Sequence, residues 1–274
     1  MTTIRRQVLA ASLVPAAALA SLLAGGPAAQ AAPVAGAAVV PATATAPSTL
    51  TVASAPSAAP VASGSVPAAP PAAASSSSVL RIGSRGRAVL AAQKRLAALG
   101  YWLGRVDGVY GPATAHAVTA LQKVAGLSRD GVLGPRTAKA LAAGTKPKAR
   151  SKRGPGIEVD LARQVLLVVR HGHVRLIFDA STGSGEYYTS GGRRKHAVTP
   201  KGTYKVYYVV DGWDPGPLGR LYRPRYFNGG IAVHGYPSVP PRPASHGCVR
   251  VTIGAMDYLV SSRFVPIGRT VIVR

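Results

Sequence analysis

Apolar positions recur with a helical period in one part of the chain and in short, strand-like runs in another. Between residues 79 and 144, side chains spaced three and four apart share a face, as on an amphipathic helix. The first set is Val89, Ala92, Leu96 and Leu99, and the second is Val118, Leu121, Gln122 and Ala125. From residue 157 to residue 274 the apolar runs are short and separated by turns. We therefore expect an all-α block followed by a mainly β block.

The helical block contains the same turn-and-helix unit twice. Residues 107–114 and 130–137 both begin Asp-Gly-Val, continue with Gly-Pro and end in Thr. Asp-Gly favours a turn, and Pro suits the first position of a helix because its missing N–H has no partner there. The units predict a three-helix bundle, although the same turns also suit a generic bundle. Tyr101, Trp102 and Tyr110 beside the turns are either exposed ligand contacts or core residues.

The second block predicts a hairpin, further strands and one helix. The hairpin runs from Gln164 to Val169 and from Val174 to Ala180. Further strands are expected at residues 202–210, 231–233 and 269–273, and a helix at residues 252–262. The loop of residues 211–226 is rich in Gly, Pro and Arg, and it predicts either a lid over a substrate or a disordered insertion.

The residues before the helical block have the composition of targeting and spacer segments. Within residues 1–31 an Arg pair precedes an apolar stretch that ends in a small-residue cleavage pattern, which predicts a secretory signal peptide. If it is retained, this segment would tether the protein to the membrane. Residues 32–78 are rich in Ala, Pro and Ser and carry no charge, so we expect a disordered linker. A second linker, residues 145–156, is short and basic.

Charge and cysteine content narrow the partners and the chemistry. The sequence has 33 Lys and Arg against 9 Asp and Glu, a formal net charge of +24, which predicts a polyanionic partner. Export disfavours nucleic acid and favours the anionic polymers of a cell wall or a membrane surface. A single Cys excludes an internal disulfide and a zinc site with several thiolates.

That single Cys lies among polar neighbours. Cys248 is accompanied by His246 and Arg250, and His234 follows a short apolar run upstream. A free thiol outside the cell is an oxidation hazard unless it is buried or needed for chemistry. A His can take the thiol proton and a nearby cation lowers the thiol pKa, so these neighbours favour a nucleophile over a core Cys.

A metal site is the competing interpretation of the same side chains. Its candidate ligands are His171, His173, His234, His246 and Cys248. Almost no carboxylate lies nearby in the sequence to orient such ligands, and His171 and His173 fall in the expected hairpin turn. We therefore expect no metal.

These motifs resemble two known families. The repeat, together with Leu96 and Gly100-Tyr101, resembles the peptidoglycan-binding domain attached to many wall enzymes. His234-Gly235 and the later Ser-His-Gly-Cys-Val-Arg segment resemble the signature of the L,D-transpeptidase catalytic domain. The resemblances imply two domains, a three-helix peptidoglycan-binding bundle at residues 79–144 and a mainly β, sandwich-like catalytic domain at residues 157–274.

The second resemblance implies roles for individual residues. Cys248 would be the nucleophile and His234 its base, with the imidazole oriented by the carbonyl of Gly235. His246 would support the thiol, and the amides of Gly247 and Cys248 would stabilise an oxyanion. The expected substrate contacts are Arg250, Ser245 and Tyr236.

The reaction implied is acyl transfer on peptidoglycan. Cys248 would attack the carbonyl of the diamino-acid residue in a tetrapeptide stem, expel the terminal D-alanine and form a thioester, which an amine then resolves. No metal or organic cofactor is expected, and the protein is expected to act as a monomer in the cell wall. Two alternatives remain open: an L,D-carboxypeptidase, in which water resolves the thioester, and a non-catalytic wall-binding protein.

Overall fold

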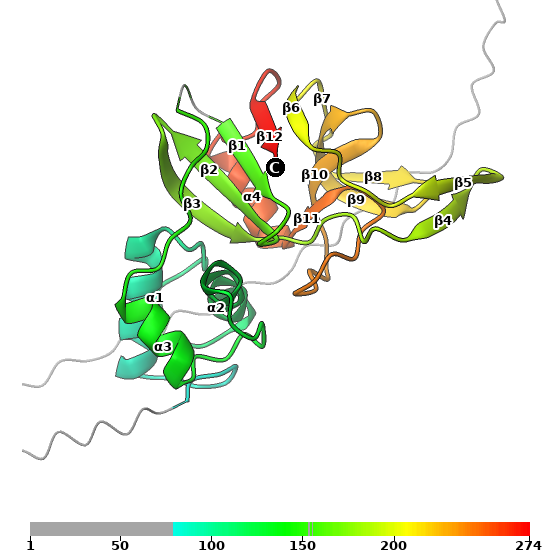
Figure 1. Ribbon diagram of the computed structural model, residues 1–274. Coiled ribbons are helices and arrows are strands. Elements are labelled where there is room, and N and C mark those ends of the chain that lie inside the picture. The colour runs from blue at the N-terminus through cyan, green and yellow to red at the C-terminus, as the bar shows by residue number, and fades with distance from the viewer. Residues whose placement is uncertain (1–78, 153, 155) are drawn as a thin grey trace, which may run out of the picture. The chain divides into compact units, whose positions relative to one another are not determined.

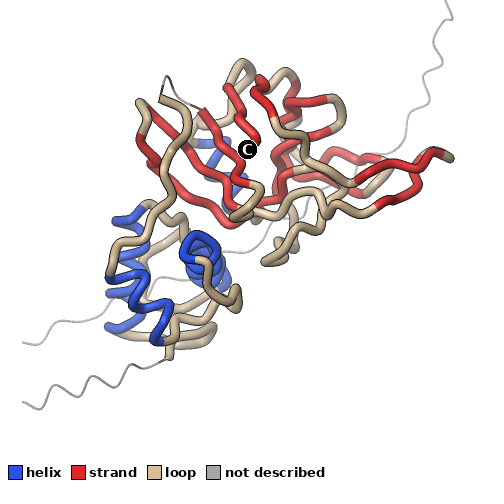
Figure 2. The backbone as a smooth tube through the Cα atoms, viewed as in Figure 1, coloured by secondary structure: helices blue, strands red, loops and turns tan. Residues whose placement is uncertain are grey.

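The computed structural model describes residues 79–152, 154 and 156–274 (Figure 1). The predicted signal peptide and first linker, residues 1–31 and 32–78, lie outside the described residues. Within the described part, helices fill the first block and strands dominate the second, which confirms the predicted order of the two blocks (Figure 2). No helix of this part is long and apolar enough to cross a membrane.

Three helices form the first block, as predicted, and a fourth lies in the β block. They are α1 (Arg87–Leu99), α2 (Pro112–Ala125), α3 (Pro135–Ala142) and α4 (Ile253–Ser261). Proline occupies the first position of α2 and of α3, where its missing N–H has no consequence. Gly100 after α1 and Gly126 after α2 adopt the left-handed conformation that ends a helix. The Gly-Pro of each repeat unit thus begins a helix, as the pattern predicts.

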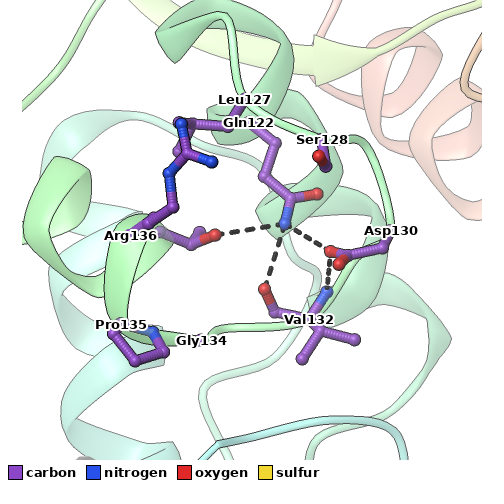
Figure 3. Close-up of a pocket in the computed structure, with 9 residues that line it drawn as sticks. Gln122, Leu127, Ser128, Asp130, Val132, Gly134, Pro135 and Arg136 are labelled. Atoms are coloured by element: carbon purple, nitrogen blue, oxygen red, sulfur yellow. Dashed lines mark hydrogen bonds between the residues drawn. The ribbon is translucent and has the colours of Figure 1, made fainter.

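Each repeat is held by a buried glutamine from the helix that precedes it. The partners of Gln93 are the Gly108 amide, Asp107 Oδ1, Val109 O and Thr114 Oγ1. Gln122 has the equivalent partners one unit later, namely the Gly131 amide, Asp130 Oδ1, Val132 O and Thr137 Oγ1. Figure 3 shows Gln122 between Asp130 and Val132. A buried amide must find its donors and acceptors locally, so these bonds fix each turn. This explains why Gln122 shares a face with apolar residues.

Tyr101 and Tyr110 are core residues. Each is 1% exposed, so the interpretation of these two as exposed ligand contacts is wrong. Their hydroxyls donate to Thr145 O and Gly131 O, which satisfies the polar tip of each ring. Trp102 is half-buried and stacks on Phe178 of the β block, with 5.7 Å between the ring centroids.

The described part of the β block contains two five-stranded sheets and a separate hairpin. In spatial order, the first sheet consists of β3 (His173–Asp179), β2 (Val165–Arg170), β1 (Gly156–Asp160), β12 (Thr270–Val273) and β6 (Gly202–Lys205). The second consists of β11 (Val249–Val251), β10 (Ile231–Gly235), β9 (Gly219–Asn228) and β7 (Tyr208–Val209), with β8 (Trp213–Gly216) also paired to β9. The hairpin joins β4 (Tyr187–Ser190) to β5 (Arg193–His196). Side chains from both sheets and from α4 share one apolar core.

Two predictions for the β block need correction. The single strand expected at residues 202–210 is two strands in different sheets. The Val206 amide donates to Arg269 O, whereas the next amide, that of Tyr207, donates to Tyr226 O in β9. Residues 211–226 include the β8–β9 hairpin, so the interpretation of this segment as a disordered insertion is wrong.

The β4–β5 hairpin has no counterpart among the predicted elements. Its two-residue turn is Gly191-Gly192, and both residues have positive φ, 59° and 69°. A turn with two positive φ values matches the twist of the strands it joins, and Gly adopts it without a steric penalty. The glycine pair was therefore a usable hairpin signal.

The helical block packs against the first sheet. Apolar residues of α1 and α2 share a core with β2 and β3. Lys123 of α2 is fully buried and donates to Asp179 at the end of β3, over 2.5 Å, and to Ala180 O, over 2.8 Å. The chain then continues along the segment that carries the candidate site, because Ser181 pairs with Arg250 and Gly183 pairs with Ser245. Residues 179–183 thus contact the helical block at one end and the loop before Cys248 at the other.

Candidate active site

Two adjacent parallel strands bring the predicted site residues together. Val233 of β10 pairs with Val249 of β11, and His234 pairs with Arg250. Cys248 directly precedes β11, so it lies next to the strand that carries His234. Both side chains line a pocket of about 530 Å³. The structure therefore places residues fourteen positions apart in the sequence at one cavity.

The loop before Cys248 is fixed by hydrogen bonds within the protein. Ser245 Oγ donates to Cys248 O over 2.5 Å and accepts from the Gly247 amide over 3.0 Å. Thr199 Oγ1 donates to Gly247 O over 2.7 Å. Ser245 is buried and its hydroxyl is used in these contacts, so the structure gives it the geometry of a positioning residue. The Gly247 amide is likewise engaged by Ser245, and an oxyanion role for Gly247 stays a prediction.

Gly247 is required by the geometry of this loop. Its φ is 135°, in the region that favours glycine, and an added Cβ would lie 2.9 Å from Val198 O. Any side chain would push the loop away from the backbone at Val198. The glycine directly before the Cys therefore sets the position of the thiol.

The surroundings of the Cys248 thiol disfavour its thiolate form. The side chain is half-buried, with Sγ 3.7 Å from Gly230 O. Burial raises the pKa of the Cys248 thiol above its ordinary value, and this outweighs the opposing effects of the Ala232 backbone and the Arg250 charge. The thiol needs a base before it can act as a nucleophile.

His234, the predicted base, is a buried imidazole at the same pocket. It is 2% exposed, and its Nδ1 lies 2.9 Å from Gly235 O. A carbonyl only accepts, so Nδ1 carries the hydrogen and Nε2 is the free acceptor of the ring. Burial lowers the pKa of His234 from 6.5 to about 4, the Gly235 carbonyl opposes this shift, and the Arg250 charge adds to it. The imidazole is therefore neutral at neutral pH.

Gly235 supplies that carbonyl, and its surroundings leave no room for a side chain at this position. An added Cβ at Gly235 would lie 2.9 Å from Tyr222 Cδ1 and 3.1 Å from Met256 Cβ. The ring of Tyr222 fills the volume that a side chain would need. In this chain the glycine thus allows β9 and α4 to pack closely behind His234.

The remaining predicted residues line the same pocket. The Arg250 guanidinium lies 4.3 Å from the ring centroid of Tyr236, and that ring lies edge-on to His234 at 5.8 Å. His246 is exposed and contacts the ring of Tyr188, with 4.6 Å between centroids. Arg250 Nε is buried and has no hydrogen-bond partner in the described part of the chain.

Sequence reasoning missed one wall of the pocket and predicted the other only as one of two alternatives. The β4–β5 hairpin contributes Tyr188, Ser190, Lys195 and His196, and the β8–β9 hairpin contributes residues 216–221. The loop of residues 211–226 was predicted as a possible cover, and its hairpin tip does line the pocket. The Gly-Gly turn was the one local signal for the other hairpin.

The structure gives no support to the metal interpretation. His171 and His173 are exposed at the β2–β3 turn, and neither lines the pocket that holds Cys248. In the described ranges, no three His, Cys, Asp or Glu side chains form a group that could hold a metal ion.

A thiol and a neutral imidazole at one pocket are the pair of groups that enzymes with a cysteine nucleophile use. The family model of the L,D-transpeptidase catalytic domain matches residues 154–273, and that of a peptidoglycan binding domain matches residues 85–141. The chain is 50% identical to the crystallised L,D-transpeptidase from Xylanimonas cellulosilytica, with 71% of this chain and 97% of that chain covered and a TM-score of 0.69. The protein belongs to the L,D-transpeptidase family and carries a peptidoglycan-binding domain on its N-terminal side.

More distant solved structures carry the same family name. An L,D-transpeptidase from Stackebrandtia nassauensis is 24% identical, over 71% of this chain and 94% of that chain, with a TM-score of 0.42. One from Mycobacterium tuberculosis is 20% identical, over 44% of this chain and 58% of that chain, with a TM-score of 0.36. A search of curated proteins gave no match.

Proposed function

We propose that the protein is an exported enzyme that cross-links peptidoglycan in the cell wall by acyl transfer through Cys248. The observation that carries this proposal is the presence of Cys248 and neutral His234 at one pocket, on neighbouring parallel strands. Family membership supports the substrate class, and the peptidoglycan-binding domain supports the same polymer as the partner.

The first step forms a bond between Cys248 and the substrate. Sγ attacks the carbonyl carbon of the diamino-acid residue in a tetrapeptide stem, and the thiol proton moves to Nε2 of His234. Burial disfavours both the free thiolate and the imidazolium, so proton transfer accompanies the attack. The Gly247 amide is occupied by Ser245, which leaves the amide of Cys248 as the assigned oxyanion donor.

The second step releases D-alanine, and the third restores the enzyme. The C–N bond to the terminal D-alanine breaks, and His234 returns the proton to the departing amine, which leaves a thioester on Cys248. An amine of a neighbouring stem then attacks the thioester carbon and gives its proton to His234. The C–S bond breaks, the new amide forms, and the thiol regains the proton. No metal or organic cofactor takes part.

The parts outside the catalytic domain would bring the enzyme to its polymer. The signal segment would export the chain, and the helical block would hold it on peptidoglycan, which raises the local concentration of stems. The net charge of +24 favours contact with anionic wall polymers and not with nucleic acid in this location. The protein acts as a monomer in this proposal.

Product analysis tests this proposal against its two alternatives. The purified protein is incubated with tetrapeptide muropeptides, and the products are separated and weighed by mass spectrometry. Dimers linked between diamino acids support acyl transfer, whereas tripeptides without dimers would indicate the carboxypeptidase. No product at all would indicate a wall-binding protein. Cys248→Ala should abolish the product, and His173→Ala, an exposed His outside the pocket, is the matched control.

A further inference from the structure

The pocket around Cys248 is lined by cations and by no carboxylate. Its positively charged side chains are Lys195 from β5, Arg220 from β9 and Arg250 from β11. None of the three forms an ion pair with another residue of the described part. The pocket therefore holds three cations that no ion pair of the described protein engages.

The carboxylates of β8 and of the segment before it are already engaged. Asp211 accepts from Arg225 over 2.6 Å and from Arg223 over 3.4 Å. Asp214 of β8 accepts from the hydroxyl of Tyr226, a pocket residue, over 2.7 Å. These contacts leave Asp211 and Asp214 paired with groups other than the three pocket cations.

Two of the pocket cations, Lys195 and Arg220, lie on hairpins that contact aromatic or loop residues at the pocket. The Arg220 guanidinium lies 5.1 Å from the ring centroid of Trp213, so the β8–β9 hairpin supports it from one side. Lys195 is directly opposite Tyr188 in the β4–β5 register, and Tyr188 contacts His246 of the loop before Cys248. Both hairpins thus present a cation at the pocket that holds the thiol.

An unpaired cation in a substrate pocket favours an anionic ligand, and carboxylates match both the Arg fork and the Lys ammonium. We propose that Lys195 and Arg220 bind side carboxylates of the stem peptide, so that the enzyme prefers stems whose side carboxyl groups are free to stems that carry carboxamides. This inference rests on the proposed function, because it assigns the bound carboxylates to the same stem that Cys248 attacks.

The preference can be tested separately from catalysis by measuring how stem peptides bind to a variant that lacks the Cys248 thiol. Calorimetry measures the Kd of Cys248→Ala for two synthetic tetrapeptide stems, one with free side carboxyl groups and one with carboxamides. The free acid should bind about five-fold more tightly or better. Adding Lys195→Gln or Arg220→Gln should weaken binding of the free acid about two- to five-fold, as expected for an exposed ion pair, and leave binding of the amide unchanged. Lys205→Gln, which removes an exposed charge of β6 outside the pocket, is the matched control and should change neither Kd.

The outcomes separate this inference from the proposed function. Equal Kd values for the acid and the amide, or equal losses in Lys195→Gln and Lys205→Gln, would overturn the carboxylate site. Loss of wall pelleting in Lys195→Gln with an unchanged stem preference would overturn it too, because the hairpin would then bind an external polymer. If the wild type makes no product but the preference holds, the proposed function fails and the carboxylate site stands.

Discussion

The buried ion pair between Lys123 and Asp179 is expected to carry much of the stability of the contact between the helical block and the β block. Lys123 is fully buried and Asp179 is 2% exposed, and they meet at 2.5 Å. Burial lowers the pKa of Lys123, and the Asp179 charge opposes that shift. The charged form of Lys123 is therefore stabilised by Asp179. In the described part of the chain, the other ion-pair partner of this carboxylate is His116, at 2.7 Å, and its side chain is 30% exposed.

Lys123→Met removes the cation and leaves the carboxylate buried. Breaking a buried pair in this way costs about 3 to 5 kcal/mol of unfolding free energy, because the remaining charge has lost its solvent and its partner. For a protein of this size the midpoint of thermal unfolding should fall by about 6 to 20 °C. Differential scanning calorimetry measures the shift, and Lys94→Met, an exposed position on α1, is the matched control.

The double variant Lys123→Met/Asp179→Leu decides whether charge is the cause. Replacing both partners by apolar side chains of similar volume is often neutral, so most of the lost stability should return. A single variant no less stable than the Lys94→Met control, or a double variant as unstable as the single one, would refute the reasoning. The second result would mean that the length and packing of the Lys123 side chain matter more than its charge.

Three further predictions concern the site. Gly247→Ala should lower turnover about 100-fold, because the added Cβ would lie 2.9 Å from Val198 O and displace the thiol. The control Gly111→Ala, which has open space at its Cβ, should keep the turnover of the wild type. Equal turnover of the two variants would contradict this prediction. The unfolding free energy should fall by about 3 kcal/mol as the pH drops from about 6.5 to about 4, because unfolded His234 takes up a proton in this range and the folded residue does not. His234→Gln should remove that part of the slope in pH-dependent chemical denaturation, and an unchanged slope would contradict it. Alkylation of Cys248 by iodoacetamide should keep accelerating up to at least about pH 9, because burial raises the pKa of the thiol; a plateau below about pH 8 would reveal a preformed thiolate.

The sequence predicted the parts of the fold that depend on local chemistry. The repeated Gly-Pro units begin α2 and α3 where the pattern places them, and the spacing of Val89, Ala92, Leu96 and Leu99 marks the buried face of α1. The segment around Cys248 and the His234-Gly235 pair are likewise local motifs. The structure adds that both belong to one pocket, through the parallel pairing of β10 and β11.

Features that depend on contacts between distant segments were not predicted. Lys123 looks like a solvated cation in the sequence, and only packing against β3 buries it. The break between β6 and β7 arises because adjacent amides bond to different sheets, which no periodicity records. The cationic lining of the pocket combines side chains from β5, β9 and β11, so it becomes visible only when those strands are placed together.

The central claim is that Cys248 becomes acylated by the stem peptide. The most direct measurement is mass spectrometry of the protein quenched in acid during turnover of a tetrapeptide stem, followed by peptide mapping. We expect an adduct of the stem minus its terminal D-alanine on the peptide that contains Cys248, and no adduct in Cys248→Ala. Dimer products without any adduct at Cys248, or an adduct that persists in Cys248→Ala, would contradict the claim.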